Sequence, residues 1–469
     1  MLKQLILENW KSFRYAELPL DPLTVLIGTN ASGKSNVVEA LEFLQRIARG
    51  ENIEAALAGD KTLPSIRGGI EWAALKPETQ FRLKALIQGE NENIDYLYSI
   101  AVQTKPIAQI LMENIIESPN EINKNNNKED LDKKYISHES LLASIKKALT
   151  PYYEVKEQIN QTKNSIDSDF TKIIDKTLLL KNLNDRNIEK LKNIPNGESL
   201  IASINENIQL LEEVKSKLIE YFNNRDKQID SLVQPLLKEY HLIVNSLENI
   251  FFINPIPSKM RDYSSISDVL QSDASNIAGV LTALPDERKV EVEATLSTYV
   301  KNLPDGDIKK VFAEAVAPLK TEAMLYCEEE WKPGETTLIN AKTMSDGTLR
   351  FLAIITALLT RPEGSQLVIE EIDNGLHPSR AELLVRILRE IGSKRKIDIL
   401  LTTHNPALLD ALGPEIVPFV VVAHRDSETG ESKLTLLEDI DNFSKLFASY
   451  SLGDMTTKGA IERSLSRNE

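Results

Sequence analysis

The residues with the clearest chemical potential form a loop near the start of the chain. The stretch "GTNASGKSN" (28–36) matches G-x-x-x-x-G-K-[ST] through Gly28, Gly33, Lys34 and Ser35. Glycines let the backbone curl so that its amides face phosphate oxygens, and a following helix start favours an anion. Lys34 is expected to neutralise the β- and γ-phosphates of ATP, and the Ser35 hydroxyl to bind Mg²⁺. The other loop residues predicted to contact the nucleotide are Asn30, Ala31, Ser32 and Asn36.

Two adjacent acids follow an apolar run far downstream. In "LVIEEIDNGLHP" (367–378) a strand-like segment ends in Glu370 and Glu371. Buried charges need solvent, a partner or a metal, so this pair is unusual at the end of a strand. Beside the phosphate loop, Glu370 could hold the Mg²⁺ shell and Glu371 could polarise the attacking water. The simpler alternative is a strand that runs out into solvent.

A histidine ends the next apolar run. In "ILLTTHNPALL" (399–409), His404 could reach the γ-phosphate and orient the water, although a lone histidine is more often structural. His377, just after Glu371, is either a helix-start residue or part of a loop that faces another subunit. The remaining histidines have no metal-ligand spacing.

The elements that carry these residues come from both ends of the chain. "LKQLILENW" and "LTVLIG" are strand-like, and "VVEALEFLQRIA" has helical periodicity. "FRLKALIQGENENIDYLYSIAVQ" predicts a β-hairpin. After residue 367, apolar strands alternate with helices, which is typical of a sheet covered on both faces.

The middle of the chain has another character. From about 115 to 250 it is polar and helical, with apolar residues at steps of three or four from Ile204 to Leu247. A partner segment from Leu141 to Leu191 and a turn at 193–199 predict either two long antiparallel helices or a compact bundle. Pro151 and Pro235 should kink or break these helices.

A serine and a glycine open another amphipathic helix, in "TMSDGTLRFLAI" (343–354). The simplest interpretation of Ser345 is a helix N-cap, because its side chain can accept a hydrogen bond from a free amide.

Taken together, these segments resemble the ABC-type ATPase heads of the SMC, RecF and OLD-like families. The resemblance covers about 1–110 and 250–450, and the stretches "PIPSKMRDYS", "SDASNIAGVL" and "YSLGDM" also resemble OLD-type relatives. It implies that Ser345 and Gly347 cross a dimer interface to the γ-phosphate bound by the partner. This chain has MSDGT where the family usually has LSGGQ, and Glu370 where an aspartate is commoner.

Four further residues have weaker assignments under this resemblance. Lys11 and Arg14 are basic residues that either contact phosphates or lie on a solvated surface. Gln80 and Gln103 are candidates for the glutamine that bridges the two lobes in relatives.

The predicted fold class is α/β: an ABC-type P-loop ATPase head, with a mixed sheet covered by helices and an inserted helical, coiled-coil domain. The expected parts are the first half of the head (1–112), the helical insertion (113–250), a helical head subdomain (251–340), the second half of the head (341–450) and a tail (451–469).

Length, charge and cysteine content narrow the range of possible functions. The chain has 469 residues, a net charge of −15 and one cysteine, which suit a protein of the reducing cytoplasm without disulfides. No apolar run reaches membrane-spanning length, and the acidic balance makes a nucleic-acid partner possible but less favoured. The segment after His404 is too short for the Toprim nuclease of OLD relatives.

We therefore expect an ATP-dependent switch that dimerises, or forms a higher oligomer, and controls a separately encoded nuclease or toxin in bacterial antiviral defence. The alternatives are a RecF- or SMC-like DNA repair or clamping ATPase, and a nucleotide-binding scaffold with negligible turnover.

Overall fold

The computed structural model describes residues 1–90, 94–119, 154, 156–172, 197–303, 307–316, 320–332, 334–372, 378–440 and 443–465. Contacts between residues divide the chain into two units. The first combines Met1–Ala143 with Leu242–Glu469, and the second is Ser144–His241. Both ends of the chain therefore build the first unit, and the second lies between them in sequence.

A six-stranded sheet forms the centre of the first unit, in the order β15-β14-β3-β13-β12-β7. All neighbouring strands are parallel except β15, which is antiparallel to β14. Every residue of β3, β12 and β13 is buried, as expected for strands covered on both faces. The strands are β3 (Leu23–Ile27), β7 (Ile250–Ile253), β12 (Gln366–Ile369), β13 (Asp398–Thr402), β14 (Val420–Arg425) and β15 (Ser432–Leu436).

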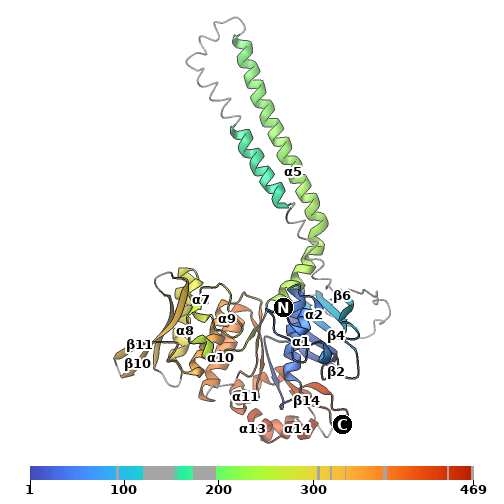
Figure 1. Ribbon diagram of the computed structural model, residues 1–469, viewed down its shortest axis with the longest axis vertical. Helices are drawn as coiled ribbons and strands as arrows, with labels where there is room; N and C mark the ends of the chain where they lie inside the picture. The colour runs from blue at the N-terminus through green and yellow to red at the C-terminus, as the bar shows by residue number, and fades with distance from the viewer. Residues whose placement is uncertain are drawn as a thin grey trace. The chain divides into compact units, whose positions relative to one another are not determined.

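A five-stranded antiparallel sheet, β2-β1-β4-β5-β6, is built from the first part of the chain (Figure 1). The predicted hairpin is confirmed as β4 and β5. The expected boundary at residue 112 falls inside β6, which stays paired with β5 as far as Pro119. The strands are β1 (Leu2–Trp10), β2 (Phe13–Pro19), β4 (Gln80–Gln88), β5 (Ile94–Gln103) and β6 (Gln109–Pro119).

The segment 251–340, expected to be helical, instead contains a third sheet. In it β10 pairs with β11, β9 and β8, all antiparallel. Buried residues alternate with less buried ones from Lys310 to Glu314 of β9, a strand period that the helical interpretation overlooked. The strands are β8 (Ser264–Ser265), β9 (Ile308–Ala315), β10 (Glu322–Lys332) and β11 (Glu335–Asn340).

Helices pack beside these sheets (Figure 1). Three of them carry or adjoin candidate site residues: α1 (Lys34–Ala48), α9 (Asp346–Thr360) and α10 (Pro378–Arg395). The others include α2 (Ile53–Ala58), α6 (Pro257–Met260), α7 (Ile277–Ala283), α8 (Asp286–Lys301), α11 (Pro406–Leu412) and α12 (Phe443–Ser449). Figure 1 shows α7 and α8 next to β10, and α1 and α2 next to β4.

The end of the chain, expected to be a tail over 451–469, packs into the first unit. It contains α13 (Leu452–Thr457) and α14 (Ala460–Leu465). Leu452, Met455 and Ile461 are buried in the main core. The Gly453 amide also donates a 2.7 Å hydrogen bond to the Asp410 carboxylate on α11.

The second unit contains an antiparallel pair of helical segments. One runs through residues 156–172, and the other belongs to α5 (Gly197–Glu248), whose last turns lie in the first unit. The pairs Lys156–Asp230 (2.7 Å), Lys163–Asp226 (3.2 Å) and Lys215–Asp167 (2.7 Å) join the two segments. The expectation for Pro235 is a kink or a break; α5 continues through this residue, so the helix does not break there. Pro151 lies outside the described residues.

Candidate functional site

Strand register brings three predicted segments to one edge of the central sheet. Leu26 of β3 is level with Thr402 of β13, and Leu401 is level with Ile369 of β12. Because these strands are parallel, Gly28, His404 and Glu370 all follow the carboxyl ends of neighbouring strands. In this order β13 lies between the phosphate-loop strand β3 and the acid strand β12.

The phosphate loop requires glycine at two positions. Gly28 has φ 144°, and a Cβ there would lie 2.1 Å from the carbonyl oxygen of Ala423 on β14. Gly33 has φ 116°, and its Cβ would lie 2.7 Å from the Phe13 ring. Both backbone conformations disfavour L side chains. The loop is therefore held tightly between β14 and the start of β2.

The polar groups of this loop suit a phosphate. Lys34 Nζ donates hydrogen bonds to the carbonyl oxygens of Gly28 (2.6 Å) and Thr29 (2.9 Å), which keeps the ammonium group over the loop. The buried Ser32 hydroxyl has no hydrogen-bond partner within the described part of the chain. Ser35 and Asn36 lie in the first turn of α1, whose free amides favour an anion. A cation and free amides in one loop suit a phosphate group, and the assignment of these residues to ATP stays a prediction.

Side chains from both ends of the chain clamp the loop and the start of α1. Asn36 Nδ2 donates to Ser12 Oγ (2.7 Å), and Ser432 Oγ donates to the same oxygen (2.8 Å). Arg425, at the end of β14, donates from Nε to the carbonyl oxygen of Ala31 (2.9 Å). The sequence alone did not reveal Arg425 or Ser432, because their bonds to Ala31 and Ser12 join residues far apart in the chain.

The two acids have different surroundings. Burial raises the pKa of Glu370 to about 7, and the nearby carboxylate of Glu39 on α1 adds to the effect. A cation near this group of carboxylates would offset their repulsion, which suits an Mg²⁺ ion at Glu370; the pairing of Glu370 with Ser35 in one metal site stays a prediction. Glu371 is exposed and has φ 45°, and its amide donates a 2.9 Å hydrogen bond to Thr402 Oγ1. Thr402 thus ties the second acid to the strand that precedes His404.

His404 is exposed, two residues beyond the end of β13. His377 lies outside the described residues. Within the described ranges, no group of three or more His, Cys, Asp or Glu side chains is arranged to hold a metal ion. Phosphate and water oxygens would therefore have to supply the rest of an Mg²⁺ shell at Ser35 and Glu370.

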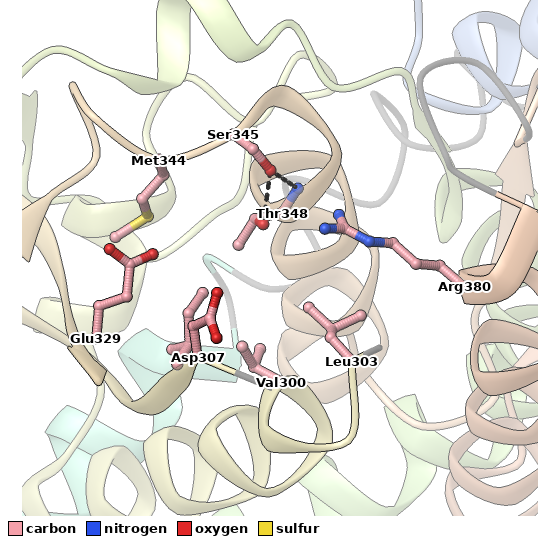
Figure 2. A pocket seen from close by; sticks show the side chains of 9 residues that line it. Val300, Leu303, Asp307, Glu329, Met344, Ser345, Thr348 and Arg380 are labelled. Carbon is pink, nitrogen blue, oxygen red and sulfur yellow. Dashed lines mark hydrogen bonds between the residues drawn. The ribbon is translucent and has the colours of Figure 1, made fainter. Parts of the chain in front are cut away.

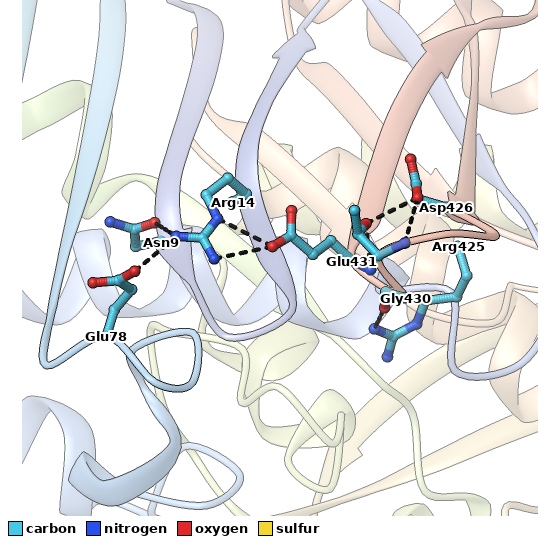
Figure 3. Close-up of polar contacts among 8 residues, drawn as sticks. Asn9, Arg14, Glu78, Arg425, Asp426, Gly430 and Glu431 are labelled. Atoms are coloured by element: carbon cyan, nitrogen blue, oxygen red, sulfur yellow. Dashed lines mark hydrogen bonds and ion pairs between the residues drawn. The ribbon is translucent and has the colours of Figure 1, made fainter. Parts of the chain in front are cut away.

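Lys11 in the β1–β2 turn and Arg14 in β2 are both engaged with acids. The side chain of Lys11 is buried, pairs with Glu39 and donates to the carbonyl oxygen of Arg67 (2.8 Å). Burial lowers the Lys11 pKa. Arg14 is half exposed and pairs with Glu78 (2.8 Å) and Glu431 (3.0 Å), as Figure 3 shows. Both side chains thus engage protein groups rather than pointing freely into the loop.

The two candidate bridging glutamines are neighbours in the five-stranded sheet. Gln80 at the start of β4 is the register partner of Gln103 at the end of β5. The Gln103 amide donates to the carbonyl oxygen of Lys105. Their role in bridging lobes stays a prediction.

Ser345 lies at the start of α9, as the N-cap interpretation predicts. Its Oγ accepts a 3.1 Å hydrogen bond from the Thr348 amide and lies 2.8 Å from Thr348 Oγ1. Ser345 is exposed and Gly347 is buried. A cap hydroxyl still has one proton to donate, so capping does not prevent a contact with a ligand.

A cavity of about 220 Å³ opens beside Ser345 (Figure 2). None of the described residues that line it belongs to the phosphate loop. They are Val300, Leu303, Asp307, Ile308, Glu329, Met344, Ser345, Thr348 and Arg380. The structure therefore groups Ser345 with α8, the β9–β10 pair and α10, and groups the loop, the acids and His404 at the edge of the central sheet.

The sequence model of one protein family, described as "AAA domain, putative AbiEii toxin, Type IV TA system", matches residues 23–410. The chain belongs to this AAA domain family. The predicted fold class, a mixed α/β P-loop ATPase head, is confirmed by this match together with the loop between β3 and α1. No curated protein matches the chain. In the parts of the chain that are described, no helix has the length and apolar character to cross a membrane.

Several solved structures of SMC head domains are similar to this chain. One is the Smc head with an extended coiled coil bound to the C-terminal domain of ScpA, derived from Pyrococcus furiosus: 14% identity, 96% of this chain and 99% of that chain covered, TM-score 0.41. Another is the Smc head with a coiled coil and joint from Pyrococcus yayanosii: 13% identity, 95% and 99% covered, TM-score 0.42. The SMC head from Thermotoga maritima has 12% identity, with 93% and 98% covered and a TM-score of 0.40.

Proposed function

We propose that this AAA domain protein binds and hydrolyses ATP with Mg²⁺ at sites shared between two copies of the chain. The observation that carries the proposal is the shared register of β3, β13 and β12, which supports one reaction centre made from Lys34, Glu371 and His404. The exposed N-cap Ser345 supports the second half of such a site, supplied by another copy.

Each residue then has a defined task. Lys34 and the loop amides hold the phosphates, and Ser35 and Glu370 would hold the metal ion, which would neutralise charge on the phosphate oxygens. Glu371 accepts a proton from the attacking water, and His404 orients that water. Ser345 and Gly347 of the other copy close the site over the γ-phosphate.

The direct test of this activity is hydrolysis by the purified full chain. We expect phosphate release that requires Mg²⁺ and saturates with ATP, and its loss in the Lys34→Ala variant. Release that persists unchanged in that variant would assign the activity to a contaminant and remove the proposal.

We further propose that ATP turnover makes this chain a switch for a separately encoded nuclease or toxin in antiviral defence. The description of the family names a toxin–antitoxin system, and such a system has two protein components, which supports a role for this chain together with a second protein. The test is phage challenge of cells that express this chain with the product of a neighbouring reading frame. Protection that needs both proteins and an intact Lys34 supports the switch.

A DNA-clamping ATPase is the second candidate. It is favoured by the antiparallel helical pair in residues 144–241, and the net charge of −15 counts against it. ATPase activity that rises with added duplex DNA, without an effect on phage growth, would support this candidate instead of the first.

A further inference from the structure

One arginine holds the loop that carries Ser345 from both sides. Arg261 follows α6, and its Nη2 donates to the carbonyl oxygen of Met344 (2.9 Å) and to the Asp346 carboxylate (2.6 Å). Met344 and Asp346 are the two chain neighbours of Ser345. One guanidinium therefore fixes the backbone before Ser345 and neutralises the acid after it.

The segment that carries Arg261 is itself anchored. Lys342 Nζ lies 5.2 Å from the centre of the Tyr263 ring, a second contact between the same two segments. Ser264 pairs with Ala323 of β10, and its hydroxyl accepts a 2.9 Å hydrogen bond from the Gly279 amide. Arg261 thus projects from a support that is bonded to the sheet and to α7.

The charge on Asp346 is the reason that this contact matters. A carboxylate next to Ser345 would repel a phosphate that approaches the same loop. On the free chain this repulsion is weak, because the Asp346 side chain is 66% exposed and water screens it. When a second copy covers the loop, water leaves and the repulsion grows, unless a cation stays beside Asp346.

We propose that Arg261 is the positioning residue of the shared site, where it aligns Ser345 and neutralises Asp346 so that the loop accepts the γ-phosphate of the other copy. This inference rests on the shared site proposed above. It also gives a task to "PIPSKMRDYS", a stretch that no part of the proposed reaction uses.

Single substitutions give the first test. Arg261→Ala should keep the fold and the ATP affinity of the separate chain and lower ATPase activity between about tenfold and a hundredfold, because the loop loses its alignment. The double variant Arg261→Ala, Asp346→Asn should recover part of that loss, since the repelling charge is gone. If Arg261 only supports the loop structurally, the double variant will have no more ATPase activity than Arg261→Ala. That result would overturn the charge role.

Arg288 provides a matched control at the other end of α9. It also donates to a backbone carbonyl, that of Leu359 (2.8 Å), and also pairs with an acid, Glu291 (2.5 Å). Arg288→Ala should change stability about as much as Arg261→Ala and leave ATPase activity near the unsubstituted level. If both variants lose activity equally, the effect belongs to α9 in general and the proposal fails. If Arg261→Ala does not fold, Arg261→Gln takes its place: the glutamine amide is a donor without a positive charge, so activity should fall, and full activity would overturn the charge role.

Mixing inactive variants separates this proposal from the proposed function. Lys34→Ala mixed with Ser345→Arg should regain partial activity, because one of the two shared sites has both an intact loop and an intact Ser345. If that mixture stays inactive although mixed dimers form, the shared site itself fails. If it regains activity, Arg261→Ala should recover when mixed with Lys34→Ala and should not recover with Ser345→Arg. Recovery with Ser345→Arg would place Arg261 on the phosphate-loop side and overturn the assignment.

Discussion

Arg425 donates a hydrogen bond from Nε to the carbonyl oxygen of Ala31 at 2.9 Å, and so ties the end of β14 to the phosphate loop. The same guanidinium donates to the carbonyl oxygen of Gly430 (2.7 Å), which holds the β14–β15 turn (Figure 3). Ala31 has φ 62°, a conformation that is uncommon outside glycine. Arg425 therefore stabilises an unfavourable loop conformation from outside.

Substitution of Arg425 should affect binding more than turnover. Arg425→Ala removes one hydrogen bond from a charged donor, so we expect KM for ATP to rise about tenfold with a smaller change in kcat. Steady-state kinetics measure both values. Arg463→Ala is the control. Arg463 lies on α14 and also donates to a backbone carbonyl oxygen, that of Lys458 (2.7 Å). Equal kinetic changes in the two variants would contradict a specific role for Arg425.

Lys34→Ala should weaken ATP binding at least about a hundredfold, because the phosphates lose their main cation. Titration with a fluorescent ATP analogue measures this affinity. Lys309→Ala is a suitable control, since Lys309 pairs with Glu330 (2.7 Å) in the β9–β10 sheet and should leave the affinity unchanged. Wild-type affinity in Lys34→Ala would refute the phosphate-loop assignment.

Glu371→Gln should separate binding from hydrolysis. The amide keeps the size of the side chain but accepts no proton, so kcat should fall about 10²- to 10⁴-fold while ATP stays bound. Single-turnover assays with radiolabelled ATP distinguish bound ATP from ADP. Glu370→Gln is the companion variant, and it should raise the Mg²⁺ concentration needed for half-maximal activity. Normal turnover in Glu371→Gln would leave Glu370 as the candidate base.

Ser345→Asn tests whether this residue does more than cap α9. Asparagine is as good an N-cap as serine, so thermal unfolding should change little, whereas Ser345→Ala should cost about 1 kcal/mol. The serine hydroxyl is lost in both variants, and we expect ATPase activity to fall in both. Full activity in Ser345→Asn would mean that the residue is only a cap.

Asp398, at the start of β13, should make stability depend on pH. Burial raises its pKa to about 6, with Asp21 adding to the effect and the Met1 amino group opposing it. The folded state therefore binds the proton more tightly than the unfolded state. The contribution of Asp398 to the free energy of unfolding is fully present at low pH and is lost as the pH rises from about 4 to about 6. Asp398→Asn should stabilise the protein by about 2 kcal/mol at pH 8 and much less at pH 4, measured by urea unfolding.

Local sequence determined the parts of this protein that depend on neighbouring residues. Two of these parts involve residues only a few positions apart: the phosphate loop with its glycines and the cap at Ser345. The β4–β5 hairpin pairs more distant residues, but its two strands and its turn follow one another in a single stretch. Their turn, capping and periodicity signals are present within single short stretches. The candidate residues Lys34, Glu371 and His404 could be named for the same reason.

Only the tertiary structure decided which strands are neighbours and which side chains hold the site. Parallel strands are joined by long crossovers, so the chain gave no local signal that β13 would lie between β3 and β12. The same is true of the bonds from Arg425 to Ala31 and from Arg261 to Asp346, which span 394 and 85 residues. The sequence shows that an arginine can donate hydrogen bonds. Which oxygen accepts them depends on how distant elements pack together.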